Sequence, residues 1–154
     1  MSSAPLNGDI VYFSYGANLS RAHMSLWCPD AVPLGRAVLS DYRLVFRCWA
    51  DIAAARDERV QGALYEVSPR DLLALDELKD CPALYHHLRV TVRTEQGLVE
   101  ALTYQMSPGH PIAFPDPDHL SLILQGYEDW GLDLDALAVM DGLRNTIWAS
   151  PNDH

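Results

Sequence analysis

The chain has 154 residues, the size of a single domain, and its 49% hydrophobic content is sufficient for a buried core. Twenty-one acidic residues outnumber eleven basic ones, which gives a formal net charge of −10. The basic residues form no run, so we expect neither a nucleic-acid nor an anionic-membrane partner.

The cysteines and the first nine residues indicate the compartment. Residues 1–9 contain neither a basic region nor an apolar stretch, and no apolar run approaches the ~18 residues of a spanning helix. Cys28, Cys48 and Cys81 are odd in number and widely spaced, which is typical of free thiols in the cytoplasm. None has a second cysteine at metal-ligand spacing. We therefore expect a cytoplasmic protein without a membrane segment or a bound metal.

The first two elements meet at a glycine. β-Forming residues predict a strand over Ile10–Ser14, and Leu19–Trp27 reads as a short helix capped by Asn18 or Ser20. At the junction, Gly16 would allow the backbone to approach a ligand, and the first N–H groups of the helix would lack partners within it. Such a turn suits an anion or a carboxylate oxygen. An ordinary strand-to-helix turn is the alternative.

The other strands follow from β-propensity and alternation. In one of them Leu88, Val90 and Val92 alternate with polar residues, the pattern of a half-buried strand. The polar residues 95–97 after it predict an antiparallel hairpin with the next strand. The strands predicted after the first are Ala37–Arg47, Val60–Val67, His86–Arg93 and Val99–Gln105.

Three further helices are expected. Ser68 and Pro69 predict the start of a helix that ends near Leu78. A second helix begins near residues 116–118 and stops at Gly131, and a third covers about 133–143. The second is expected to turn Leu120, Ile123, Leu124 and Tyr127 inward. Residues 9–145 then form one domain between loose termini at 1–8 and 146–154, of class α+β with a curved or closed antiparallel sheet.

Five short motifs in order resemble those of the gamma-glutamylcyclotransferase-like family. The segment Tyr15–Leu19 is similar to the family's Tyr-Gly-Ser-Asn-Leu, with Ala17 at the serine position. The other similar segments are 24–46, 60–65, the Leu75-Asp76 pair with Tyr85 downstream, and 126–132. The resemblance implies a small, mainly antiparallel β-barrel flanked by helices, with a ligand cavity at the opening beside the glycine loop.

The resemblance also implies a reaction. In that family the α-amine of a gamma-glutamyl amide or peptide attacks its own γ-carbonyl, which releases an amine and 5-oxoproline. The reaction needs a base and then an acid, but no cofactor. Carried over to this sequence, the small-molecule substrate would lie against a loop of Tyr15, Gly16, Ala17 and Asn18, with Tyr85 as a wall. Tyr104 could line the cavity or belong to the core.

One position departs from the family pattern. Lys79 stands where the family has its catalytic glutamate, and Asp80 stands at the following glycine. Lys79 could be an exposed residue at a helix end. It could instead be functional, as a clamp for a substrate carboxylate or as a desolvated base. In a third alternative Asp80 or Glu77 supplies the carboxylate, which requires a local shift because one helical step rotates a side chain by about 100°.

The resulting hypothesis is a divergent enzyme that acts on a small amino-acid-like or gamma-glutamyl amide substrate by acid/base chemistry. The alternatives are a non-catalytic binding protein and a working cyclotransferase that uses Asp80 or Glu77. We expect Asp76, Glu77 and Asp80 to favour the charged form of Lys79, and the protein to release little 5-oxoproline from ordinary gamma-glutamyl substrates. His110 and His119 could border the cavity. The sequence leaves the leaving group and the oligomeric state open.

Overall fold

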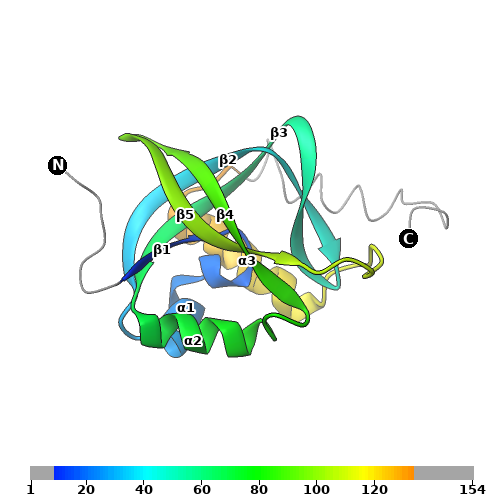
Figure 1. The fold of residues 1–154 in the computed structure, drawn as a ribbon, viewed down its shortest axis with the longest axis horizontal. Helices are drawn as coiled ribbons and strands as arrows, with labels where there is room; N and C mark the ends of the chain where they lie inside the picture. Colours follow the sequence, from blue (N-terminus) through cyan, green and yellow to red (C-terminus); the bar gives the residue numbers. More distant parts are fainter. Residues whose placement is uncertain (1–8, 134–154) are drawn as a thin grey trace.

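A closed β-barrel is the centre of the computed structural model, which describes residues 9–133 (Figure 1). The strand order around the barrel is β1-β3-β2-β4-β5. All neighbouring pairs are antiparallel except β1 with β5, which are parallel. This confirms the expected α+β, mainly antiparallel barrel. The strands are β1 (Ile10–Ser14), β2 (Val32–Arg47), β3 (Trp49–Val67), β4 (Tyr85–Thr94) and β5 (Gly97–Met106).

The first half of β3 is an element that the sequence did not predict. Residues 49–59 pair with β2 in a hairpin that turns at Cys48, which has a φ of 72°. Alanines and charged residues dominate this stretch, and these residue types are depleted in strands. Pairing with the long β2, together with burial of Ala50 and Ile52, overrides that local preference.

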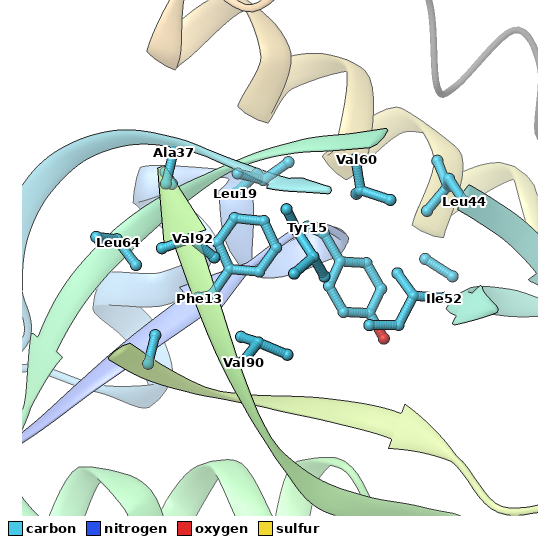
Figure 2. Close-up of a cluster of buried hydrophobic side chains, with 14 of the residues drawn as sticks. Phe13, Tyr15, Leu19, Ala37, Leu44, Ile52, Val60, Leu64, Val90 and Val92 are labelled. Atoms are coloured by element: carbon cyan, nitrogen blue, oxygen red, sulfur yellow. The ribbon is translucent and has the colours of Figure 1, made fainter. Parts of the chain in front are cut away.

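The barrel interior is filled by side chains from all five strands. The β4 residues Val90 and Val92 point inward as their alternation predicted, and the 95–97 hairpin is confirmed. Figure 2 shows how Phe13 and Tyr15 lie among branched side chains from the surrounding strands. The labelled members of this core are Phe13, Tyr15, Leu19, Ala37, Leu44, Ile52, Val60, Leu64, Val90 and Val92.

The helices pack outside the barrel. A 3-10 turn, η1 (Ala17–Leu19), leads into α1 (Arg21–Trp27), whose N-cap is Ser20 rather than Asn18. The predicted helix after Ser68 is α2 (Pro69–Leu78). The remaining helix, α3 (Pro117–Trp130), is capped by Asp116 and ends at Gly131 with a φ of 62°. Helix α2 lies beside α1 at the bottom of the view in Figure 1.

Two expectations about the C-terminal region have different outcomes. The α3 residues Ile123 and Tyr127 are fully buried as predicted, but Leu124 is 40% exposed, so its inward assignment was wrong. It is adjacent to the buried stripe but lies on the solvent side of the helix. The predicted helix over 133–143 and the termini 1–8 and 146–154 lie outside the described residues, apart from Asp133. Within residues 9–133 no helix is both long and apolar enough to cross a membrane.

The cap of α2 provides a first testable prediction. The Ser68 hydroxyl accepts a hydrogen bond from the Asp71 N–H at 3.1 Å. Ser68→Ala removes this acceptor and is expected to lower the free energy of unfolding by about 1 kcal/mol, as measured by urea denaturation. Ser68→Thr, which keeps the hydroxyl that caps the helix and donates to Asp30, should stay near wild type. Equal losses in both variants would contradict a capping role.

Candidate active site

The glycine loop is held between the barrel and α3. The Tyr15 hydroxyl donates to the backbone oxygen of Tyr104 at 2.6 Å, and the Asn18 Nδ2 donates to the Tyr12 hydroxyl at 3.0 Å. Gly16 packs so closely on Ala50 that an added Cβ would lie 3.2 Å from the Ala50 Cβ. Ala17 is also buried. The predicted binding loop is therefore fixed by hydrogen bonds on both sides of its glycine.

Asn18 itself has unused hydrogen-bonding capacity. Its side chain is 1% exposed, and the Oδ1 atom has no hydrogen-bond partner within residues 9–133. A buried acceptor without a partner costs about 1–3 kcal/mol. A donor from water or a ligand at the loop would remove that cost.

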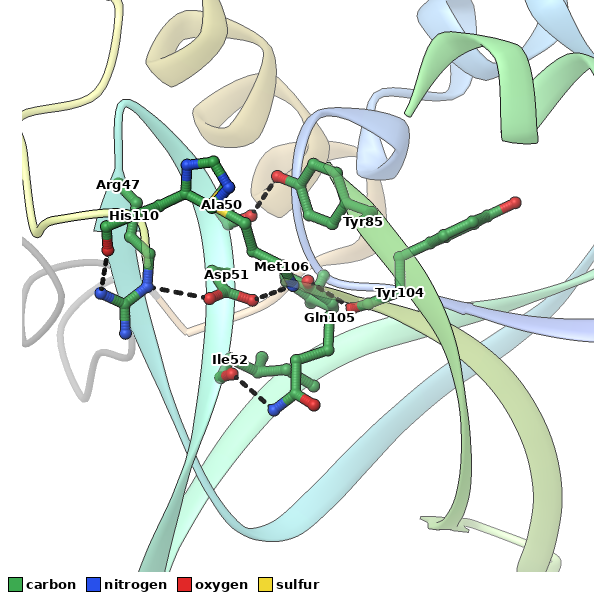
Figure 3. Close-up of polar contacts among 10 residues, drawn as sticks. Arg47, Ala50, Asp51, Ile52, Tyr85, Tyr104, Gln105, Met106 and His110 are labelled. Carbon is green, nitrogen blue, oxygen red and sulfur yellow. Dashed lines mark hydrogen bonds and ion pairs between the residues drawn. The ribbon is translucent and has the colours of Figure 1, made fainter. Parts of the chain in front are cut away.

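Ala50 joins three elements at the site. Its N–H donates to the His119 Nε2 on α3 at 3.0 Å, and its oxygen accepts from the Tyr85 hydroxyl at 2.7 Å. The second contact appears in Figure 3. Since the β3 segment that contains Ala50 was not predicted as a strand, sequence reasoning missed this connection.

Asp51, beside Ala50, was also missed. It is 3% exposed, and its carboxylate contacts the Arg47 Nε at 3.0 Å and accepts from the Met106 N–H at 2.8 Å. Arg47 in turn donates to the His110 oxygen at 2.8 Å (Figure 3). Asp51 therefore ties the β2–β3 hairpin to β5. His110 contributes its backbone oxygen to this network, as the acceptor of the Arg47 hydrogen bond.

Tyr85 and Tyr104 form the walls of the site. Both are buried, and their ring centroids are 6.4 Å apart in an edge-on arrangement. The Tyr104 hydroxyl donates to the Asp76 Oδ1 at 2.6 Å. This hydrogen bond and burial raise the pKa of Tyr104 well above its usual value, as burial does for the pKa of Tyr85. Both phenols therefore stay protonated at neutral pH.

Lys79 lies against these walls. It is the C-cap of α2 and is partly buried, with its Nζ 5.1 Å from the centroid of the Tyr85 ring and 5.9 Å from that of Tyr104. No carboxylate of the described residues forms an ion pair with it. The structure therefore brings Lys79, Tyr85 and Tyr104 together, and Tyr104 connects them to the Tyr15 loop.

Burial determines the acidity of Lys79. Desolvation lowers its pKa from 10.5 to about 8. The acids predicted to favour the ammonium form do not offset this desolvation, although a pKa of about 8 still leaves most of the amine protonated at pH 7. Asp76 is engaged by Tyr104 and by His87, whereas the Glu77 and Asp80 side chains are exposed.

His119 and His23 lie within the electrostatic range of Lys79. Burial, reinforced by the Lys79 charge, lowers the pKa of His119 to about 4 and lowers the pKa of His23. His119 is therefore a neutral imidazole at pH 7. Because its Nε2 accepts from Ala50, its Nδ1 must carry the proton.

One group in the described part of the chain has the residue types of a metal site. Potential ligand atoms of Asp76, Cys81 and His87 lie within 4.8 Å of one another. The His87 Nε2 already contacts the Asp76 Oδ1 at 2.7 Å, and burial raises the pKa of the Cys81 thiol. These contacts satisfy the polar groups without an ion, so we assign no metal to them. The expected absence of a metal stays a prediction.

Known proteins resemble this chain over most of its length. It is 27% identical to a gamma-glutamylcyclotransferase of Bos taurus, over 95% of this chain and 81% of the relative. It is 25% identical to a gamma-glutamylcyclotransferase of Homo sapiens, over 86% and 78% of the two chains. A solved structure called gamma-glutamyl cyclotransferase superposes with a TM-score of 0.76 at 25% identity, covering 95% of this chain and 90% of the other.

The family comparison confirms the resemblance inferred from the motifs. The family described as "Gamma-glutamyl cyclotransferase, AIG2-like" matches residues 12–144, which include every described strand and helix apart from the first two residues of β1. The chain therefore belongs to the gamma-glutamyl cyclotransferase, AIG2-like family.

Proposed function

We propose that this protein is a divergent cyclotransferase-type enzyme of the cytoplasm, in which Lys79 takes the proton-transfer role of the family's glutamate. Its substrate is a small amino-acid-like molecule or gamma-glutamyl amide, and the reaction uses no cofactor. The observation that carries the proposal is the position of the Lys79 amine against Tyr85 and Tyr104, where no carboxylate of residues 9–133 forms an ion pair with it. Family membership supports the reaction class.

A single amine can carry out both proton transfers. Neutral Lys79 accepts a proton from the substrate ammonium, and the freed α-amine then attacks the γ-carbonyl carbon to close the five-membered ring. The Lys79 ammonium gives this proton to the departing amine as the amide bond breaks, and the ring nitrogen loses its second proton to water, from which the released amine takes up a proton. Backbone N–H groups of the Gly16–Asn18 loop stabilise negative charge on the carbonyl oxygen. The proton count is unchanged over the cycle.

The alternative carboxylates are less well placed. Glu77 and Asp80 are exposed, and within residues 9–133 their side chains form no hydrogen bond or ion pair that would aim them at the Tyr85–Tyr104 wall. Lys79 needs no backbone shift, because its Nζ already lies at this wall. We therefore assign proton transfer to Lys79.

The pKa of Lys79 predicts alkaline activity. At pH 7 a pKa of about 8 leaves about nine-tenths of the amine protonated, and this charge repels the substrate ammonium. We expect kcat/KM for 5-oxoproline release from a gamma-glutamyl amine to rise about tenfold per pH unit below pH 8 and then to level off. Chromatography of released 5-oxoproline between pH 6 and 9 measures this profile.

Two variants at one position separate the hypotheses. Lys79→Gln cannot transfer a proton and is expected to be inactive throughout the range. Lys79→Glu restores the family carboxylate, and its activity should no longer depend on a group titrating near pH 8. A flat wild-type profile, or full activity in Lys79→Gln, would refute the role of Lys79. Binding of gamma-glutamyl amines without release of 5-oxoproline at any pH would instead indicate the binding-protein alternative.

A further inference from the structure

Lys79 is chemically unique in this chain. It is the only lysine among the 154 residues, so it carries the only side-chain primary amine. It lies at the C-cap of α2, and the residue as a whole is partly exposed. Its neighbours at the site are the rings of Tyr85 and Tyr104 rather than a carboxylate.

Loss of hydration, more than the two rings can offset, favours an uncharged amine. A lysine ammonium in water is stabilised by hydration, and a buried one is stabilised by an anionic partner. The Lys79 amine has lost part of its hydration, and within residues 9–133 no carboxylate forms an ion pair that would compensate for this loss. The Tyr85 and Tyr104 hydroxyls donate their protons elsewhere, to Ala50 and Asp76, so the rings present only their weakly attractive π-systems to the amine.

We propose that Lys79 is also a covalent carbonyl-binding site, at which the amine forms an imine with a small aldehyde or 2-oxo acid that enters beside Tyr85 and Tyr104. Desolvated lysines are the usual nucleophiles for such carbonyl substrates. The inference goes beyond cyclisation, because it requires neither a gamma-glutamyl group nor turnover.

The proposed step is balanced without a further reactant. The Lys79 nitrogen lone pair forms a bond to the carbonyl carbon, and a proton moves from nitrogen to the carbonyl oxygen. The resulting carbinolamine loses water, and a carbon–nitrogen double bond remains. Neither an oxidant nor a reductant is consumed. The enzyme is regenerated when water adds back.

The lowered pKa supports a fast reaction at neutral pH. About one-tenth of Lys79 is neutral at pH 7, against roughly 0.03% of an ordinary lysine with a pKa of 10.5. The neutral fraction of Lys79 is therefore about 300 times that of an ordinary lysine at pH 7. Nucleophilicity falls with basicity, and a Brønsted coefficient of about 0.4–0.5 lowers this ratio by about 10–18-fold, so we expect Lys79 to react about 20-fold faster than an exposed lysine at pH 7.

An exposed reference amine can be placed in the same molecule. Arg59 on β3 is exposed, and within the described residues its side chain has no hydrogen bond or ion pair, so Arg59→Lys keeps the charge and should leave the fold unchanged. The variant is incubated with propanal or with glyoxylate, and imines are trapped with cyanoborohydride. Peptide mass spectrometry then gives separate rates for Lys79, for the introduced lysine and for the N-terminal amine.

The expected result is trapping at Lys79 about 20-fold faster than at the introduced lysine at pH 7, with the ratio falling below one above pH 10.5. Faster reaction with glyoxylate would identify 2-oxo acids as the class, and faster reaction with propanal would identify uncharged aldehydes. Equal or slower trapping at Lys79 at pH 7 would overturn the proposal. This failure would leave the 5-oxoproline assay unaffected, so the two proposals can fail separately.

Discussion

Lys79→Met is expected to make the folded protein more stable while it stops proton transfer. The lower pKa of Lys79 in the folded state, about 8 against 10.5, corresponds to a loss of about 3 kcal/mol in the free energy of unfolding before solvent screening is considered. Because Lys79 is only partly buried, solvent screening reduces the expected gain to about 1–3 kcal/mol at pH 7. Methionine keeps much of the aliphatic chain against the two tyrosines without a charge to desolvate.

The pH dependence of this gain has a defined sign. The folded state holds the Lys79 proton less tightly than the unfolded state, so the destabilisation by Lys79 is complete below about pH 8. Wild-type stability therefore rises relative to Lys79→Met as the pH increases from 8 to 10.5. Urea denaturation of both proteins at pH 7 and pH 10 measures the difference, which should fall to about a quarter at the higher pH.

Arg59→Met is the matched control, since it removes an exposed cation. Its free energy of unfolding should stay within about 0.5 kcal/mol of wild type at both pH values. If the Lys79→Met protein is more stable but inactive, Lys79 is a residue that is retained for function at the expense of stability. A large loss of stability at pH 7 would show that Lys79 is a structural residue instead.

Gly126→Ala is expected to destabilise the protein by about 3 kcal/mol. An alanine Cβ here would lie 2.3 Å from the Leu19 Cβ and 2.7 Å from the backbone nitrogen of Ser20. The clash involves backbone, so it cannot be relieved by a rotamer change. The gain of about 1 kcal/mol in helix propensity does not compensate for it.

The same substitution should weaken substrate binding. The end of η1 follows the glycine loop directly, and α3 holds this turn through the Trp130 Nε1, which donates to the Leu19 oxygen at 2.9 Å. Moving α3 outward displaces Leu19 and therefore the loop N–H groups. We expect KM for the gamma-glutamyl amine to rise, since a small misplacement of binding groups has a large effect.

Ser121→Ala tests the specificity of this effect, because Ser121 is an exposed residue of the same helix. It should leave both stability and KM near wild type. Wild-type stability and KM in Gly126→Ala would show that the contact between α3 and η1 does not position the loop.

Local sequence determined several elements of this fold. The Ser68-Pro69 start of α2, the Gly131 end of α3 and the alternation of β4 were all readable, because caps and side-chain periodicity depend on neighbouring residues. Motif order also predicted the family, which the family comparison confirms. These features require no knowledge of distant contacts.

Tertiary structure alone decided the strand at 49–59 and the chemistry of Lys79. Residues Ala50 and Asp51 have little local tendency to form a strand, and they do so because β2 supplies backbone partners and β5 supplies the Met106 N–H. The acids next to Lys79 in sequence suggested a firmly held ammonium. In the fold, two tyrosines from β4 and β5 surround its amine while Asp76 is engaged elsewhere, so desolvation outweighs proximity in sequence.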